Sequence, residues 1–453
     1  MNASVRDHLR DVKRTLTKHI ISTPSDSIVT SSQDDSALAS VPSPSGERLG
    51  VLREISDGSS KKRFVEVWRG DRLEATKEVT KTHEGFHVNR APFQVVVHIR
   101  SNLIILFPAT FFSLSFSNSE TSFVYTAEAK TSEPSDTSLE AVKSKFRFVP
   151  DFGERLTGKK RPALYIFRWD TPTYQDESDN SASEIEEVPQ TSATVIALKP
   201  SLPEDSSIVF GQASFSPDQK NIFATGYEET FDGRRLGPVG CWNHPSAIYR
   251  LDIPSELPSD SDEISVEALR LTPPELSARS PRVTNAASSQ PYMTVWLANL
   301  IGGPHASCTA LHMLRSDEDR SRVLVDCVVD PTHHASFPGL YTDQLPFRPF
   351  LSLQADVKGA SHLVTHSLWG SRQTVLGISL TSGQVQNLTP EQNMSWTIAG
   401  TDGKEGLLAT RSTINSPNEL VAARFQNLGL SLDWKVIDKP RLTLWGGSAK
   451  KSA

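Results

Sequence analysis

The sequence predicts an all-β fold, a β-propeller of about seven blades whose terminal blades can be incomplete. Two observations lead to this prediction. Short alternating apolar runs recur in pairs along the 453 residues, and turn-forming residues separate them. Proline (29 residues) outnumbers glycine (25 residues), a balance typical of many short strands and loops rather than long helices.

A turn-like motif recurs along the chain and precedes a strand each time. Its copies are Ser43-Pro-Ser-Gly46, Phe116-Ser-Asn-Ser-Glu120, Phe215-Ser-Pro-Asp218 and Ser280-Pro-Arg282. Serine and aspartate side chains close such turns by hydrogen bonds, and proline presets the backbone angle φ. We expect each copy to mark the turn between the innermost strand of a blade and the strand that follows it.

The first 40 residues are predicted to form a short helix and part of the first blade. Apolar residues recur at spacings of three and four between Arg6 and Ile21, as in an amphipathic helix: Leu9, Val12, Leu16 and Ile20. We expect the propeller to cover residues 41–440 and residues 441–453 to form a disordered tail.

An apolar stretch from Phe93 to Phe116 approaches the length of a membrane-spanning helix. It contains Arg100, and an arginine near the centre of a bilayer costs about 2.5–3.5 kcal/mol. Pro108 interrupts it as well, so we expect no membrane span. Residues 88–110 are instead predicted to be an apolar insert. Such an insert is unusual, because loop segments are normally polar.

Charge and cysteine content limit the partners and the compartment. The net charge is −6 and no basic stripe occurs, which argues against nucleic acid as a partner. The cysteines Cys241, Cys308 and Cys327 are odd in number and form no C-x-x-C, which argues against a disulfide framework or a zinc ribbon. The N-terminus lacks the apolar core of a secretory signal. We therefore expect a cytoplasmic protein.

No serine stands in the motif that serine hydrolases of the α/β type require. G-x-S-x-G lifts the serine hydroxyl above the sheet on a sharp turn, and glycine must stand on both sides. The chain has five Gly-x-Ser triplets, but the residues two positions after each serine are Lys62, Leu363, Thr381, Asp433 and Lys450. No catalytic residue is predicted.

Other candidate sites are equally incomplete. Ile301-Gly-Gly-Pro-His305 has the glycines of an oxyanion hole, but it lies between two strand-like runs, which favours a propeller loop. Three pairs of neighbouring histidines occur, and two ligands specify a metal site too loosely: His83 and His87, His333 and His334, His362 and His366. No phosphate-binding loop occurs. We predict no cofactor and no metal, and we expect core packing for Trp68, Trp169, Trp296, Trp369 and Trp396.

Several segments resemble successive blades of one peptidase family, the acylaminoacyl-peptidases or acylamino-acid-releasing enzymes. They occur in the family's order over most of residues 5–440: residues 43–53 with Phe64-Val-Glu-Val-Trp68, residues 114–128, Phe148-Val-Pro-Asp-Phe-Gly-Glu154, Phe210-Gly-Gln-Ala213 with Phe215-Ser-Pro-Asp218, and residues 237–251. Residues 88–110 have no counterpart in the family, and our interpretation of them is a retained intron or an error in the gene model.

The resemblance implies an N-terminal propeller joined to a C-terminal α/β-hydrolase of the prolyl-oligopeptidase clan of serine peptidases. In that family the hydrolase removes N-acylated amino acids from short blocked peptides, and the propeller covers the active site and limits substrate size. This chain lacks the Ser-Asp-His triad and ends about where the propeller would end. We therefore expect a truncated, non-catalytic propeller that is inactive alone, with N-acylated peptides or a peptidase catalytic domain as partners and a homo-oligomer as its assembly.

Two other functions stay open at this point. The chain can be an independent propeller that binds proteins or peptides as a scaffold, because both roles use loops on one face of the propeller. It can also be an active enzyme that uses Gly302 to His305, which requires a hydrolase activity sensitive to substitution of His305.

Overall fold

The computed structural model describes the chain from residue 2 to residue 439, with gaps. The larger gaps are 8–11, 23–26, 33–36, 89–92, 105–109, 131–147, 171–191, 285–290, 331–335, 353–360 and 427–431. Every regular element in the described part is a β-strand, which confirms the all-β class. The same part contains no helix of sufficient length and apolarity to cross a membrane. The tail expected at 441–453 lies outside the described residues.

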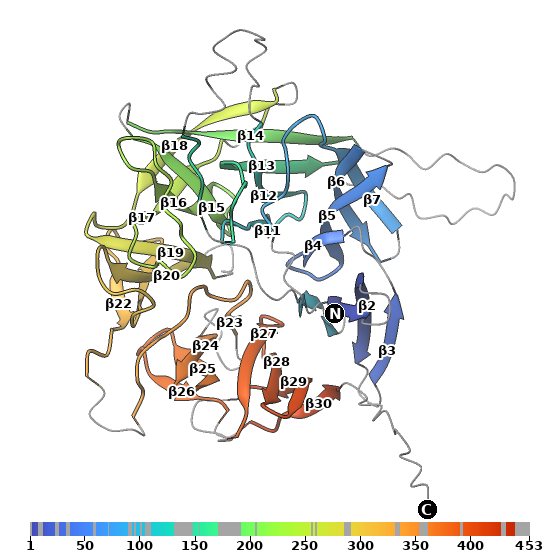
Figure 1. Ribbon diagram of the computed structural model, residues 1–453, viewed down its shortest axis with the longest axis vertical. Coiled ribbons are helices and arrows are strands. Elements are labelled where there is room, and N and C mark those ends of the chain that lie inside the picture. Colours follow the sequence, from blue (N-terminus) through green and yellow to red (C-terminus); the bar gives the residue numbers. More distant parts are fainter. Residues whose placement is uncertain are drawn as a thin grey trace, which may run out of the picture.

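The strands form sheets of four that follow one another around a ring (Figure 1). Seven such sheets can be traced in the described residues. The N-terminal one lies between the first sheet that follows it and the C-terminal sheet, so that the first and last sheets of the chain are neighbours in the ring (Figure 1). This arrangement confirms the predicted β-propeller.

The N-terminal sheet has the order β3-β2-β1-β8. Its strands are β1 (Asn2–Asp7), β2 (Val12–Ser22), β3 (Ser27–Ser32) and β8 (Phe93–Gln94). The segment expected as an apolar insert thus supplies one strand of this sheet, with Phe93 opposite Ala3. It also forms a separate hairpin of β9 (Val97–Ile99) and β10 (Asn102–Ile104).

The predicted N-terminal helix is wrong. Residues 2–7 and 12–22 are antiparallel strands, with Leu16 opposite Ala3 and Ile20 opposite Val29 in the next strand. Five of the eleven residues of β2 are β-branched, a composition that favours strands because such side chains lose rotamer freedom in a helix. The spacing of apolar residues alone did not reveal this preference.

In each of the other sheets, the strands follow one another outward from the axis in chain order. Two of these sheets are joined through their outer strands. The next two sheets comprise β4 (Ala37–Pro42), β5 (Arg48–Asp57), β6 (Ser60–Arg69) and β7 (Arg72–Glu78), then β11 (Leu114–Phe116), β12 (Ser122–Glu128), β13 (Pro162–Trp169) and β14 (Ala193–Ser201). The fourth comprises β15 (Ile208–Phe215), β16 (Asn221–Glu228), β17 (Ser246–Asp252) and β18 (Glu263–Arg270). The outer strands β14 and β18 pair in parallel, which merges the third and fourth sheets.

The last three sheets complete the ring. They comprise β19 (Leu276–Val283), β20 (Met293–Leu300), β21 (Ala310–Arg315) and β22 (Arg322–Val325), then β23 (Phe350–Leu351), β24 (His362–Trp369), β25 (Arg372–Ser379) and β26 (Val385–Asn387), and finally β27 (Ser395–Thr401), β28 (Gly406–Thr413), β29 (Ser416–Arg424) and β30 (Lys435–Asp438).

The apolar core lies between neighbouring sheets. Phe116, Phe123 and Trp169 of one sheet pack with Val67 of the previous sheet in a single buried cluster. Large buried aromatic side chains fill these layers, each removing a wide apolar surface from water. Three of the tryptophans expected in the core are almost fully buried: Trp169, Trp296 and Trp396. The other two, Trp68 and Trp369, are half-buried.

Three copies of the repeated turn occupy the predicted position. The copies at residues 43–46, 117–120 and 216–218 connect the innermost strand of a sheet to its second strand. The copy at Ser280-Pro-Arg282 differs, because it lies inside the innermost strand β19 at a β-bulge between Arg279 and Arg282. A bulge suits this sequence, because Pro281 has no N–H group to donate to the neighbouring strand.

Candidate functional site: the central channel

The inner strands surround two cavities near the axis of the propeller. The larger cavity is lined from β4, β11, β15, β19 and β23 by residues that include Val41, Phe116, Phe215, Arg282 and Phe350. The smaller cavity is lined by residues that include Gln212, Tyr227, Trp242 and Arg279. The innermost strands of most of the ring therefore meet at these two spaces.

Residues 341–350, which we call the channel segment, contribute to the walls of both cavities. Asp343 and Gln344 line the smaller cavity, whereas Phe347 and Arg348 line the larger one. This segment precedes β23 in the chain and is not itself part of a sheet up to Phe350. One stretch of irregular backbone therefore lies beside both cavities.

Arg279 and Arg282 of β19 hold the channel segment through its carbonyl oxygens. Arg279 donates to the carbonyl oxygens of Asp343 at 2.8 Å and Thr342 at 3.0 Å. Arg282 donates to the carbonyl oxygens of Pro346 and Leu345, both at 2.7 Å. Each guanidinium thereby supplies the donors that an irregular buried backbone lacks within itself.

The bulge in β19 makes this double contact possible. Ser280 adopts a φ of +60° between the two arginines, and its N–H donates to the side-chain oxygen of Gln212 at 2.7 Å. The Ser280 hydroxyl in turn accepts a hydrogen bond of 2.9 Å from the N–H of Leu345. An uninterrupted strand alternates its side chains between the two faces of the sheet. The extra residues of the bulge change that alternation and direct Arg279 and Arg282 to the same segment.

A third arginine joins the channel segment to the opposite side of the ring. Arg348 donates to the carbonyl oxygens of Pro42, at 2.9 Å, and of Ser43 at the end of β4. The ring of Phe347 contacts the ring of Phe112 edge-on, with centroids 5.4 Å apart, and Arg282 lies over its face at 5.2 Å. The segment is thus fixed to sheets on both sides of the axis.

Arg279 and Arg282 are buried almost completely and Arg348 is half-buried, and the loss of contact with water lowers the proton affinity of all three. Desolvation lowers the pKa values of Arg279, Arg282 and Arg348, each to about 10. These values lie well above neutral pH, so the three side chains remain cationic. The centre of the propeller therefore carries three positive charges that are bonded mainly to backbone oxygens.

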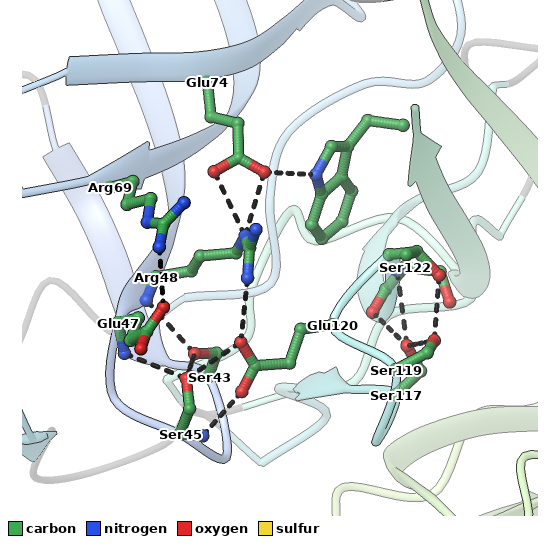
Figure 2. Close-up of polar contacts among 12 residues, drawn as sticks. Ser43, Ser45, Glu47, Arg48, Arg69, Glu74, Ser117, Ser119, Glu120 and Ser122 are labelled. Carbon is green, nitrogen blue, oxygen red and sulfur yellow. Dashed lines mark hydrogen bonds and ion pairs between the residues drawn. The ribbon is translucent and has the colours of Figure 1, made fainter. Parts of the chain in front are cut away.

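A charged network joins the β4–β7 sheet to the β11–β14 sheet (Figure 2). Arg48 donates to Glu74 at 2.9 Å and forms an ion pair with Glu120 at 3.2 Å. The Trp169 indole N–H also donates to Glu74, at 3.0 Å. Glu120 belongs to the turn of the next sheet and accepts hydrogen bonds from the N–H of Ser45 at 2.5 Å and from its hydroxyl at 2.9 Å. The network therefore joins the repeated turns of two neighbouring sheets.

The same turn also contacts the sheet on its other side. Ser119 donates to the side-chain oxygen of Gln219 at 2.7 Å, and Asn118 donates to the carbonyl oxygen of Pro217 at 3.1 Å. The repeated turns are thus linked in succession around part of the ring. Their Ser, Asn and Glu side chains serve contacts between sheets in addition to closing each turn.

The Gly302–His305 motif lies in the turn between β20 and β21. The N–H of Gly302 donates to the carbonyl oxygen of Asn243 at 3.0 Å, and the N–H of Gly303 donates to the carbonyl oxygen of Leu300 at 3.2 Å. Both N–H groups that an oxyanion hole would use are therefore engaged within the fold.

Two of the three histidine pairs lie within the described part of the fold. His83 contacts the carbonyl oxygen of Glu84 at 2.8 Å and the Tyr125 hydroxyl at 3.1 Å. His362 and His366 both lie on β24, and a ring nitrogen of His362 contacts the hydroxyl of Ser361 at 2.8 Å. In the described residues, no group of three or more metal-binding side chains is brought together. His333 and His334 lie outside the described residues.

Sequence reasoning missed the channel segment and the three arginines that hold it. Arginine is normally an exposed residue, so Arg279 and Arg282 gave no sign of their burial. Two sequence features could have indicated this site. Ser280-Pro281, which favours a bulge, lies between two arginines, and Pro346 and Pro349 flank an aromatic and a basic residue.

A family model described as "Acylamino-acid-releasing enzyme, N-terminal domain" matches residues 13–444. The acylamino-acid-releasing enzyme of Arabidopsis thaliana is 25% identical over 408 residues, which cover 84% of this chain and 46% of the relative. The enzyme of Mus musculus is 26% identical over 408 residues, covering 84% and 47%. The chain thus spans about half the length of the curated relatives it matches.

Solved structures show a partial likeness to this chain. Pyrococcus horikoshii acylaminoacyl peptidase is 9% identical, with a TM-score of 0.48, covering 97% of this chain and 50% of that chain. Prolyl oligopeptidase B from Galerina marginata is 10% identical, with a TM-score of 0.47, covering 89% and 42%. The family match extends over nearly the whole propeller. This chain therefore belongs to the family formed by the N-terminal domain of acylamino-acid-releasing enzymes.

Proposed function

We propose that this propeller restricts, by size, the access of N-acylated peptides to a serine hydrolase domain of the acylamino-acid-releasing type. The observation that carries the proposal is the channel segment. An extended peptide that moved along the propeller axis would have to displace residues 341–350. Arg279 and Arg282 hold these residues on one side, and Arg348 of the segment binds the end of β4 on the other side.

The physical basis of the restriction is the cost of opening the axis. Displacing the segment breaks several hydrogen bonds between buried charged groups and carbonyl oxygens, each worth about 1.5–3 kcal/mol. Opening would also leave the three arginines without these hydrogen-bond acceptors, unless water or substrate replaced the carbonyl oxygens. A short peptide can reach the hydrolase around the propeller without displacing the channel segment. A long or folded chain is excluded by the ring of sheets.

The test is a fusion in which this chain precedes the hydrolase half of the Arabidopsis thaliana relative. The measurement is kcat/KM on a short acetylated peptide and on an acetylated peptide several times longer. We expect the Arg282→Ala, Phe347→Gly double variant to raise kcat/KM for the long peptide by about tenfold, which corresponds to 1.4 kcal/mol. Hydrolysis of the short peptide reports that the hydrolase is folded and is expected to change little.

Arg250→Ala provides the control, because Arg250 is partly exposed and pairs with Asp252 on the surface. It removes an arginine without touching the channel segment. Equal ratios of long to short peptide hydrolysis in the wild-type fusion and the double variant would contradict the proposal, provided the short peptide is still cleaved.

A further inference from the structure

Two of the three cysteines lie together at the outer part of the β19–β22 sheet. Cys308 precedes β21 and Cys327 follows β22, and these strands pair with Leu311 opposite Val325. Continuing that register places the two cysteines diagonally across the end of the pair. The thiol of Cys327 contacts the carbonyl oxygen of Cys308 at 3.2 Å, and both residues are half-buried free thiols.

The surroundings favour a thiolate at Cys308. The N–H of Val328 donates to the sulfur of Cys308 at 3.4 Å. The pKa of Cys308 is lowered to about 6, with the neighbouring thiol of Cys327 as the largest cause and backbone N–H groups as further causes. The partner shifts in the opposite direction, because it keeps the proton that the pair shares. One nucleophilic sulfur therefore lies beside one protonated thiol.

The pair also lies next to the start of the channel segment. A Cβ atom placed on Gly339 would lie 2.3 Å from the sulfur of Cys308, so only glycine allows this approach. Thr309 pairs with Leu340 in an isolated bridge immediately beside it. The sulfur of Cys308 is therefore held between the end of β22 and the backbone that enters the axis.

We propose that Cys308 and Cys327 are a redox modification site that forms a reversible disulfide by exchange with a low-molecular-weight disulfide such as oxidised glutathione. The Cys308 thiolate attacks one sulfur of that disulfide, forming a mixed disulfide and releasing one glutathione thiolate. Cys327 then loses its proton to solvent and attacks the Cys308 sulfur, which releases the second glutathione thiolate. Two protein thiols are oxidised, and one glutathione disulfide is reduced to two thiols. This proposal is independent of the proposed function.

The test equilibrates the folded chain with glutathione mixtures from fully reduced to fully oxidised, followed by acid quenching, alkylation and trypsin digestion. Trypsin cuts after Arg315, Arg320 and Arg322, so the two cysteines fall on different peptides unless a disulfide joins them. We expect the joined peptides to accumulate with oxidation, the intact chain to lose about 2 Da, and dithiothreitol to reverse both changes.

Cys241→Ser is the matched control, because Cys241 is also a half-buried free cysteine. It should leave the yield of joined peptides unchanged, whereas Cys308→Ser and Cys327→Ser should abolish them. The wild-type chain decides the question even if a variant folds poorly. Full alkylation of both cysteines in the most oxidised mixture would overturn the proposal. Joining of Cys241 to either cysteine at comparable yield would overturn it as well.

Discussion

The guanidinium of Arg282 donates a hydrogen bond of 2.7 Å to the carbonyl oxygen of Pro346, 64 residues further along the chain. Proline carbonyls in irregular backbone have no sheet partner of their own, so a buried one needs a donor from elsewhere. Arg282 provides it and also donates to Leu345 and Pro281. One side chain therefore satisfies three carbonyl oxygens where the channel segment crosses the inner strands.

Replacing Arg282 with alanine should destabilise the propeller by about 3 kcal/mol or more, because each buried carbonyl left without a donor costs about 1–3 kcal/mol. Urea unfolding of the purified chain measures the loss. Arg282→Lys should recover only part of it, because an ammonium group cannot reproduce the planar set of donors. A loss below about 1 kcal/mol would show that water replaces the guanidinium and that the segment does not depend on it.

Local features of the fold were predictable because their causes are local. The turn at Ser43-Pro-Ser-Gly46 was recognised from residues that close a turn by themselves, and it lies where it was expected. The N-terminal helix was predicted wrongly, because the period of the apolar residues was compatible with a helix. The β-branched residues of β2 and its pairing with β1 and β3 favour a strand instead.

The channel segment was not predictable for the opposite reason. Its structure depends on Arg279, Arg282 and Arg348, whose partners are carbonyl oxygens of residues distant in sequence. Backbone oxygens carry no sequence signal, so no pattern of side chains reveals such bonds. The Cys308–Cys327 contact was missed similarly, because the spacing of the two residues resembles no known motif, and only the pairing of β21 with β22 brings them together.

The link between the two repeated turns gives a second prediction. Glu120→Ala removes an acceptor for the N–H and hydroxyl of Ser45 and leaves Arg48 with Glu74 alone (Figure 2). Hydrogen bonds to a charged group are worth about 1.5–3 kcal/mol, so we expect a loss of about 2 kcal/mol in the free energy of unfolding.

Glu47→Ala is the control for this experiment. Glu47 pairs with Arg69 in the same region, but both side chains are about half exposed, at 55% and 48%. Exposed ion pairs contribute about 0–1 kcal/mol. Urea unfolding of the two variants should therefore separate them clearly. Similar losses would mean that the buried network does not connect the sheets more strongly than a surface pair.

Two buried histidines make stability depend on pH. Burial lowers the pKa of His83 to about 4 and that of His87 to about 3. Between their ordinary pKa of about 6.5 and these values, the unfolded chain binds protons that the folded chain does not. The free energy of unfolding should therefore fall as the pH drops through this window, with His83 contributing a total of about 3 kcal/mol.

The measurement compares unfolding free energies of the wild type and His83→Gln at several pH values within that window. The variant should show a shallower dependence, by at most about 1.4 kcal/mol per pH unit, because one titrating group is removed. His83→Gln, His87→Gln should be shallower still. Parallel curves for the wild type and His83→Gln would show that His83 already becomes protonated in the folded chain.

Two glycines of the β23–β26 sheet allow strain and crowding to be separated. Gly370 in the β24–β25 turn has a φ of +66°, and Gly383 in the β25–β26 turn has a φ of +74°, so alanine is strained at both. A Cβ atom on Gly370 would meet nothing within 4 Å, but one on Gly383 would lie 2.0 Å from the carbonyl oxygen of Leu324 in the neighbouring sheet.

Gly370→Ala should reduce the free energy of unfolding by about 1–2 kcal/mol, because alanine is strained in the left-handed conformation. Gly383→Ala should cost about 1–3 kcal/mol more, because the two sheets must separate to admit the methyl group. Thermal and urea unfolding of both variants measure the difference, and equal losses would show that the β19–β22 and β23–β26 sheets do not pack as closely at Leu324 as the structure places them.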